Sequence, residues 1–458
     1  MRNFLLFALV VFIILFGCAC MAQRTVKIQI ESASEHPGSD ITDENFRLRS
    51  HKRSMGENPI FGGPASDDAV LYENSEAEEA LDQFVRSDEE EDVLDQFVQS
   101  DEAVVLHVDE SSQVSEENRV AELISSMSIE EKVSQLFILS IDSHSSGSSA
   151  GLDAFISETQ AGGYILFANN ITTVVGTREL TDAISDFSVL SPFICIDEEG
   201  GVVSRLRSAG LPEFSPIPAA RDIGASGDLD RAYEAGAAIG MMLAEIGVNL
   251  NFAPVADVLS NPRNTVIGSR SFGSNPVLVS DMVAAFQAGL RGAGILSSPK
   301  HFPGHGNTAD DSHFGSAVVS GDITFLLTVD FLPFQRLIFE GAEFVMMGHL
   351  LLPEVEPGGF PATLSRFFVS DVLRDFMGFE GVIVTDAMNM GAISLEFSPG
   401  DAAVLAVLAG VDMILMPDDF VQARDGLLRA IDDGVISVER IDESLFRIFT
   451  VKYNAGLL

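Results

Sequence analysis

The sequence predicts an α/β fold, a single (β/α)8 barrel of the TIM type formed by residues 118–458. Short apolar runs alternate with amphipathic stretches along roughly 340 residues, the pattern of a parallel sheet with helices packed outside it. The runs are apolar throughout, as expected for strands buried on both faces. Polar residues follow the ends of these runs, and in a barrel all such ends open on one face. A doubly wound open sheet is the alternative, because alternation alone does not show that a sheet closes.

Eight apolar runs are expected to be strands: Gln135–Ser140, Gly163–Ala168, Phe193–Asp197, Asn249–Pro254, Ile295–Lys300, Phe344–Gly348, Val382–Asp386 and Asp412–Met416. Amphipathic periodicity indicates helices between them, at Ala232–Ile246, Pro276–Arg291, Phe331–Glu340, Ser365–Phe376 and Ala402–Leu408. Upstream, residues 120–133 have helical periodicity in two short pieces. Ser128 followed by Glu131 is a capping-box pattern, which predicts the start of the second piece.

Residues 1–23 have the features of an export signal. Arg2 precedes the apolar run Phe4–Phe16, which is shorter than a membrane-spanning helix requires. Residues 15–18 resemble a bacterial lipoprotein box, in which Cys18 would become the lipidated first residue and tether the protein to a membrane. Simple cleavage after Ala22 is the alternative. Both readings predict an exported protein, either a lipoprotein of the cell envelope or a periplasmic or extracellular protein.

Residues 24–117 are rich in Ser, Glu and Asp, and residues 94–102 nearly repeat residues 81–89. Two copies are too few for a repeat fold. We expect a disordered, self-repelling acidic tether. Short helices that dock on a partner are the alternative.

The chain carries a net charge of −41. Residues 31–120 contribute −19, from 25 acidic and 6 basic residues, and residues 121–458 contribute −25, from 43 acidic and 18 basic residues. Residues 1–30 add the remaining +3. Such a surplus of negative charge argues against nucleic acid and anionic membrane surfaces as partners. Cys195 lies inside an apolar run, so we expect a buried, unreactive thiol. If Cys18 and Cys20 belong to the signal, no disulfide framework is available.

Titratable side chains concentrate in the stretch Ser297–His313, which also contains two prolines and two glycines. These residues exclude a regular helix and indicate a loop that follows a buried strand. Elsewhere, polar residues again follow the expected strands: Asp197, Glu198 and Glu199 after the third, Asp257 after the fourth, Lys300 and His301 after the fifth, His349 after the sixth and Asp386 after the seventh. The pattern predicts an active site at the carboxyl ends of the strands.

Three of these stretches together resemble glycoside hydrolase family 3, in its β-N-acetylglucosaminidase branch. They are Ile196–Arg205, Lys300–Gly306 with Asp311–His313, and Val384–Met388. The motifs occur in the order and spacing of the family. The resemblance covers about residues 120–458 and leaves out 24–117. It implies a retaining β-N-acetylglucosaminidase that acts through a covalent glycosyl-enzyme on peptidoglycan fragments or chitooligosaccharides.

The resemblance implies a role for each matching residue. Asp386 would be the nucleophile that attacks the anomeric carbon. His313 would be the general acid and base, oriented by Asp311, on a loop made mobile by Gly304, Gly306 and Gly315.

Asp197, Arg205, Arg270, Lys300 and His301 would bind the sugar at subsite −1. Asp257 and His305 are expected to support the loop and the barrel mouth. Family members often carry arginine where this chain has Val202, and we expect that difference to affect local packing.

Several alternatives remain open at this point. A metal site of His301, His305, His313, His349 and Asp386 is disfavoured, because Pro303 and Gly304 break the helix that would align the first two histidines. A phosphorylase or another β-glycosidase on the same barrel is possible, and so is a non-catalytic sugar-binding lipoprotein. The resemblance implies neither a metal nor an organic cofactor. We expect a monomer with a carbohydrate substrate.

Overall fold

The computed structural model of the chain describes residues 110–141, 149–308 and 317–458. All eight expected strands are confirmed, each within or close to the predicted run. They are β1 (Phe137–Ser140), β2 (Gly163–Leu166), β3 (Phe193–Ile196), β4 (Leu250–Asn251), β5 (Leu296–Ser297), β7 (Phe344–Met347), β9 (Val382–Thr385) and β10 (Ile414–Leu415). Apart from Ser140 at the end of β1 and Leu296 at the start of β5, their side chains are buried, which explains their mainly apolar sequences.

The strands form a curled parallel sheet. Six pair in the order β10-β1-β2-β3-β4-β5, and β7 pairs with β9, in each case in parallel. Isolated parallel bridges connect Phe302 with Met347 of β7, and Val384 of β9 with Met413 next to β10. A small parallel pair that the sequence did not suggest, β6 (Ala317–Val318) with β8 (Leu350–Leu351), lies outside this sheet.

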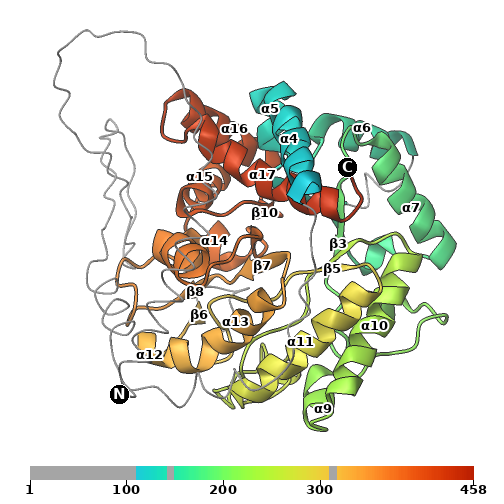
Figure 1. Ribbon diagram of the computed structural model, residues 1–458, viewed down its shortest axis with the longest axis vertical. Helices are drawn as coiled ribbons and strands as arrows, with labels where there is room; N and C mark the ends of the chain where they lie inside the picture. The colour runs from blue at the N-terminus through green and yellow to red at the C-terminus, as the bar shows by residue number, and fades with distance from the viewer. Residues whose placement is uncertain (1–109, 142–148, 309–316) are drawn as a thin grey trace, which may run out of the picture. The chain divides into compact units, whose positions relative to one another are not determined.

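Helices connect the strands and cover the sheet (Figure 1). The longer ones are α4 (Glu110–Ser126), α6 (Ser149–Thr159), α7 (Val174–Phe187), α10 (Leu229–Glu245), α11 (Pro276–Gly292), α13 (Phe331–Phe339), α15 (Pro399–Ala409), α16 (Phe420–Asp432) and α17 (Val438–Asn454). The shorter ones are α5 (Ile129–Ser134), α8 (Arg205–Ala209), α9 (Ala220–Gly224), α12 (Ile323–Phe325) and α14 (Gly391–Ser394). The described residues also contain 3₁₀ turns at η1 (Ala168–Asn170), η2 (Gly268–Arg270) and η4 (Ala362–Leu364).

The five helices expected from periodicity are all present, but one has a different hydrogen-bond pattern. The segment expected at Ser365–Phe376 is a π-helix, η5 (Phe367–Phe376), and a second π-helical turn, η3 (Leu326–Asp330), leads into α13. The capping box is also confirmed. Glu131 N donates to the hydroxyl of Ser128 at 3.3 Å, and Ser128 N donates to the carboxylate of Glu131 at 2.7 Å.

Helices α10 and α11 lie side by side along the sheet (Figure 1). Glycines permit the close approach, because a Cβ atom on Gly236 would lie 2.1 Å from the carbonyl oxygen of Phe286. A Cβ atom on Gly289 would likewise lie 2.2 Å from the carbonyl oxygen of Tyr233. Since α10 leads into β4 and α11 into β5, this contact sets the two strands beside each other.

The first and last helices of the described region also pack together, α4 against α17 (Figure 1). Helix α4 begins at Glu110 and therefore crosses the expected domain boundary at residue 118. Cys195 is a buried free thiol, as expected. Within the described ranges, no helix is both long and apolar enough to span a bilayer. The predicted signal, Cys18 and the near-repeat lie outside these ranges.

Candidate functional site

Lys300 is at the centre of a cluster of polar side chains, here called the Lys300 cluster, whose other members are Asp197, Glu199, Arg205, Arg270 and His301. Its ammonium nitrogen lies 2.6 Å from Asp197 Oδ1 and 2.7 Å from Glu199 Oε1, and its side chain is only 3% exposed. Burial alone would lower the pKa of Lys300, but the charges of Asp197 and Glu199 outweigh burial and raise it. The side chain is thus a buried, charged ammonium group that joins the end of β3 to the loop after β5.

Glu199 is the second anchor of the cluster. Arg270 grips it with two hydrogen bonds, from Nε and from one terminal nitrogen, each 2.8 Å long. Burial acts to raise the pKa of Glu199, but Arg270 and Lys300 hold it well below its usual range. Asp197 forms a similar ion pair, with its Oδ2 atom 3.2 Å from a terminal nitrogen of Arg205. The guanidinium carbon of Arg205 lies 5.2 Å from the ring centre of Phe167.

Asp257 holds the loop that carries Lys300 and His301. Its Oδ2 accepts a hydrogen bond from His301 Nδ1 at 2.7 Å, and its Oδ1 accepts from the backbone N–H groups of His301 and His305. A carboxylate only accepts, so His301 carries a proton on Nδ1. Its Nε2 lies 3.4 Å from a terminal nitrogen of Arg270. Burial opposes ionisation of Asp257, but these partners lower its pKa.

His305 has the supporting role that the sequence suggested. Burial, reinforced by the charge of His301, lowers the pKa of His305 to about 4. Its Nδ1 lies 2.8 Å from the hydroxyl of Thr308, which ties the loop to itself. The glycines of this loop are required by close packing, because a Cβ atom on Gly306 would lie 1.8 Å from the carbonyl oxygen of Val258. This contact explains why position 306 is glycine, and the expected movement of the loop stays a prediction.

Asp386 follows the last residue of β9 and is partly buried. Its Oδ1 accepts a hydrogen bond from Ala387 N at 2.7 Å. Burial acts to raise the pKa of Asp386, but His301, His349, this N–H group and Lys300 together lower it. Asp386 is therefore an ionised carboxylate within the electrostatic reach of the Lys300 cluster.

His349 and Glu198 support the surrounding backbone. His349 Nε2 donates to the carbonyl oxygen of Ala387 at 3.0 Å, which steadies the residue next to Asp386. Glu198 is buried, burial raises its pKa, and its Oε2 accepts a hydrogen bond from Leu206 N at 3.0 Å. Sequence reasoning placed both residues at strand ends but assigned neither of them this role.

The structure brings together all five residues expected to bind the sugar. Asp197, Arg205, Arg270, Lys300 and His301 form one continuous network of contacts. Asp311 and His313 lie outside the described residues, as does Gly315. Glu199 was not predicted as a site residue, although its place in a run of three acids after a strand was a signal. Val202 is 71% exposed, so the expected effect on packing is wrong.

One member of the disfavoured metal site, His313, lies outside the described ranges. Among the residues that are described, no three His, Cys, Asp or Glu side chains are grouped so that they could hold a metal ion.

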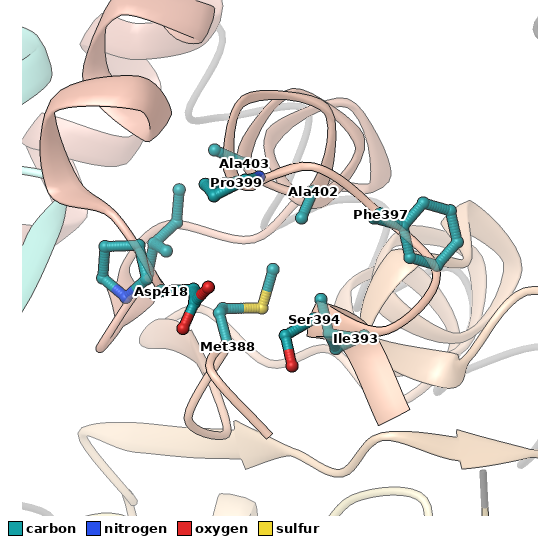
Figure 2. Close-up of a pocket in the computed structure, with 10 residues that line it drawn as sticks. Met388, Ile393, Ser394, Phe397, Pro399, Ala402, Ala403 and Asp418 are labelled. Carbon is teal, nitrogen blue, oxygen red and sulfur yellow. The ribbon is translucent and has the colours of Figure 1, made fainter. Parts of the chain in front are cut away.

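Two cavities lie close to the strand ends. One of about 10 Å³ lies beside Met388, two residues after Asp386, and is lined by Ile393, Ala402 and their neighbours (Figure 2). It has room for about one water molecule. A larger cavity of about 310 Å³ is lined by Glu198, Met242 and residues of the segment 204–217.

Comparison with known proteins gives consistent matches. The family model described as "Glycosyl hydrolase family 3 N terminal domain" matches residues 128–451. Beta-hexosaminidase A of Pseudoalteromonas piscicida is 36% identical over 330 residues, which cover 66% of this chain and 54% of that protein. Beta-hexosaminidase LpqI of Mycobacterium tuberculosis is 32% identical over 334 residues, 71% of this chain and 83% of that protein.

Among solved structures, a glycoside hydrolase family 3 beta-N-acetylglucosaminidase from Paenibacillus sp. str. FPU-7 has a TM-score of 0.69 at 36% identity. The match covers 72% of this chain and 63% of the Paenibacillus chain. The chain thus spans about half the length of the first curated relative and less than two thirds of the Paenibacillus protein.

The buried ion pairs lead to a stability prediction. Glu199→Gln leaves Arg270 and Lys300 without a shared counter-charge, so we expect the free energy of unfolding to fall by about 3–5 kcal/mol. Asp182→Asn is the control, because the ion pair of Asp182 with Arg178 is about half exposed and should contribute less than about 1 kcal/mol. Urea denaturation monitored by circular dichroism measures both. Equal, small effects of the two substitutions would contradict the buried network.

Proposed function

Because the chain belongs to glycosyl hydrolase family 3, we propose that it is a retaining β-N-acetylglucosaminidase. It releases terminal β-linked N-acetylglucosamine from peptidoglycan fragments or chitooligosaccharides through a covalent glycosyl-enzyme. The observation that carries this proposal is the ionised Asp386, which follows a strand and lies near the Lys300 cluster. The side chains of that cluster are of the kinds that bind sugar hydroxyls. Two family relatives, named beta-hexosaminidases, support the sugar that we propose.

Asp386 acts as the nucleophile. Its hydrogen bond from Ala387 N leaves Oδ2 for attack on the anomeric carbon, and a lowered pKa keeps it ionised at neutral pH. A carboxylate in this position can trap the oxocarbenium-like transition state as a covalent intermediate. His349 and Lys300 favour the negative charge before attack.

The Lys300 cluster binds the sugar at subsite −1. Asp197 and Lys300 present an acceptor and a donor to neighbouring sugar hydroxyls, and Arg205 holds Asp197 in place. Arg270 and His301 add donor groups at the same edge of the sheet. Buried partners hold these side chains before the sugar arrives, which lowers the entropy lost on binding.

His313 acts as the general acid and base, and Asp311 orients its ring. This part of the proposal is supported by the Asp-Ser-His motif at 311–313 and by its position after the loop 300–306. The same group first protonates the leaving oxygen and then deprotonates the attacking water.

We further propose that the eight parallel strands close into a complete (β/α)8 barrel. The isolated bridges from Phe302 to β7 and from β9 to Met413 support closure. The remaining elements of the proposal are an export signal over residues 1–23, an acidic tether over 24–117 and a barrel over 118–458. The sequence of residues 1–23 supports the signal, an envelope location and lipidation of Cys18, and the composition of residues 24–117 supports the tether. Membership of the family supports activity without a cofactor, and we also propose a monomer.

A panel of p-nitrophenyl glycosides, assayed with and without phosphate, tests the proposed activity. We expect turnover of the β-N-acetylglucosaminide with free sugar as the product. A sugar-1-phosphate that forms only with phosphate present would instead identify a phosphorylase. Binding of N-acetylglucosamine without turnover of any glycoside would identify a sugar-binding protein.

The nucleophile can be identified directly. Asp386→Ala is expected to lower kcat by at least about 10³-fold while the circular dichroism spectrum is unchanged, because the covalent route is lost. A 2-fluoro or 5-fluoro sugar should label the wild-type protein on Asp386, as measured by intact-mass and peptide mass spectrometry. A label on another residue would refute the assignment.

His313→Ala is expected to slow both chemical steps, since one group serves as acid and base. An activated aryl glycoside needs little protonation and should rescue only the first step, so that the glycosyl-enzyme accumulates and gives a burst of phenol. Asp311→Asn should show a milder form of this behaviour. Rapid-mixing kinetics measure the burst. Equal and undiminished turnover of activated and natural substrates by His313→Ala would exclude His313 as the acid and base.

A further inference from the structure

Asp330 is a buried carboxyl group with no assigned role. It ends the π-helical turn η3, directly before α13, and is 1% exposed. Both of its carboxyl oxygens are buried, and neither has a hydrogen-bond partner among the described residues. An unpaired buried polar group is destabilising and rare in native proteins, so its presence requires an explanation.

Helix capping does not explain Asp330. An aspartate before a helix ordinarily accepts a hydrogen bond from the first turn. Here the backbone of Asp330 is already helical, its side chain makes no capping hydrogen bond, and Phe331 N donates to Leu326 O across the π-turn. The wide turn thus places Asp330 inside a helical run rather than at its start. Such π-turns are frequent at functional sites.

The carboxyl group of Asp330 packs against the loop that carries Lys300 and His301. A Cβ atom on Gly304 would lie 2.7 Å from both Cβ and Cγ of Asp330 and 3.0 Å from its Oδ2. Position 304 therefore has no room for a side chain. Gly304 N donates to His301 O at 2.8 Å. Asp330 therefore packs against the turn that contains His301.

Asp257 contacts the same loop, because it accepts hydrogen bonds from His305 N and from the backbone N–H and Nδ1–H of His301. Two carboxyl groups therefore contact one loop. They differ in charge. Asp257 has donors and is ionised, whereas Asp330 has none among the described residues. Burial, with the charge of Asp257 added, raises the pKa of Asp330 well above its usual value. A carboxylic acid that keeps its proton has the size and shape of an amide.

We propose that Asp330 is a positioning residue whose uncharged carboxyl group fills the space beneath Gly304 and holds Lys300 and His301 in place for the sugar. This inference rests on the proposed function for its kinetic consequence. Asp330 touches no reacting group and acts through the backbone of residues 301–305. A misplacement of about 1 Å in such a loop can change a rate by about 10²-fold.

Two substitutions and one spectrum test the proposal. Asp330→Asn keeps the size and lacks a charge, so kcat/KM for p-nitrophenyl N-acetyl-β-glucosaminide should stay within about threefold of wild type. Asp330→Ala empties the space and should lower kcat/KM by about tenfold or more, largely through KM, because the sugar-binding side chains shift. The infrared difference spectrum of wild type minus Asp330→Asn at neutral pH should show the C=O band of a protonated carboxylic acid.

Leu327→Ala is the matched control, since Leu327 is buried in the same π-turn. It should lower the melting temperature but leave KM unchanged. The proposal is overturned if the acid band is absent, if the Asn variant is as impaired as the Ala variant, or if Leu327→Ala raises KM equally. Should the Ala variant fail to fold, the Asn variant and the spectrum still decide. A wild-type protein without turnover would refute the proposed function, whereas the infrared band would still report on Asp330.

Discussion

The site depends on one buried ammonium group. Lys300 is almost completely removed from water, and it remains charged only because Asp197 and Glu199 lie within 2.7 Å of it. Those two carboxylates in turn orient Arg205 and Arg270, and Arg270 reaches His301. Removing Glu199, for example, would leave Arg270 without its carboxylate partner in a poorly solvated place. The network therefore joins the end of β3 to the loop after β5.

The sequence was sufficient for the strands and for the polar residues that follow them. The strands are buried on both faces, so their positions are visible as uninterrupted apolar runs such as Phe193–Ile196. Parallel strands place the residues that follow them on one edge of the sheet. For this reason the sequence alone could predict that Asp197, Lys300 and Asp386 lie near one another. Closure of the sheet left no such signal, since it depends on long-range pairing of short strands such as β5 and β10.

The sequence was not sufficient to predict which side chains contact one another between distant parts of the chain. Glu199 is one of three successive acids, and nothing local distinguishes the one that binds Arg270 from the one that accepts Leu206 N. Asp330 resembles a helix cap in sequence and differs only because a π-turn shifts it into the helix. The close packing of Gly306 could not be predicted for the same reason, since the carbonyl group that it approaches belongs to Val258, nearly fifty residues away.

The contact between α10 and α11 has a consequence for how the protein tolerates mutation. Gly236 and Gly289 meet the backbone of the opposite helix, and neither is part of the ion-pair network. Yet these helices deliver β4 and β5, and with them Asp257 and Lys300, to their places. A mutational scan scored by activity would therefore mark these two glycines as essential, and a reader of that scan would mistake them for part of the site. In this domain, residues that position the strands are therefore as sensitive to substitution as residues that take part in the chemistry.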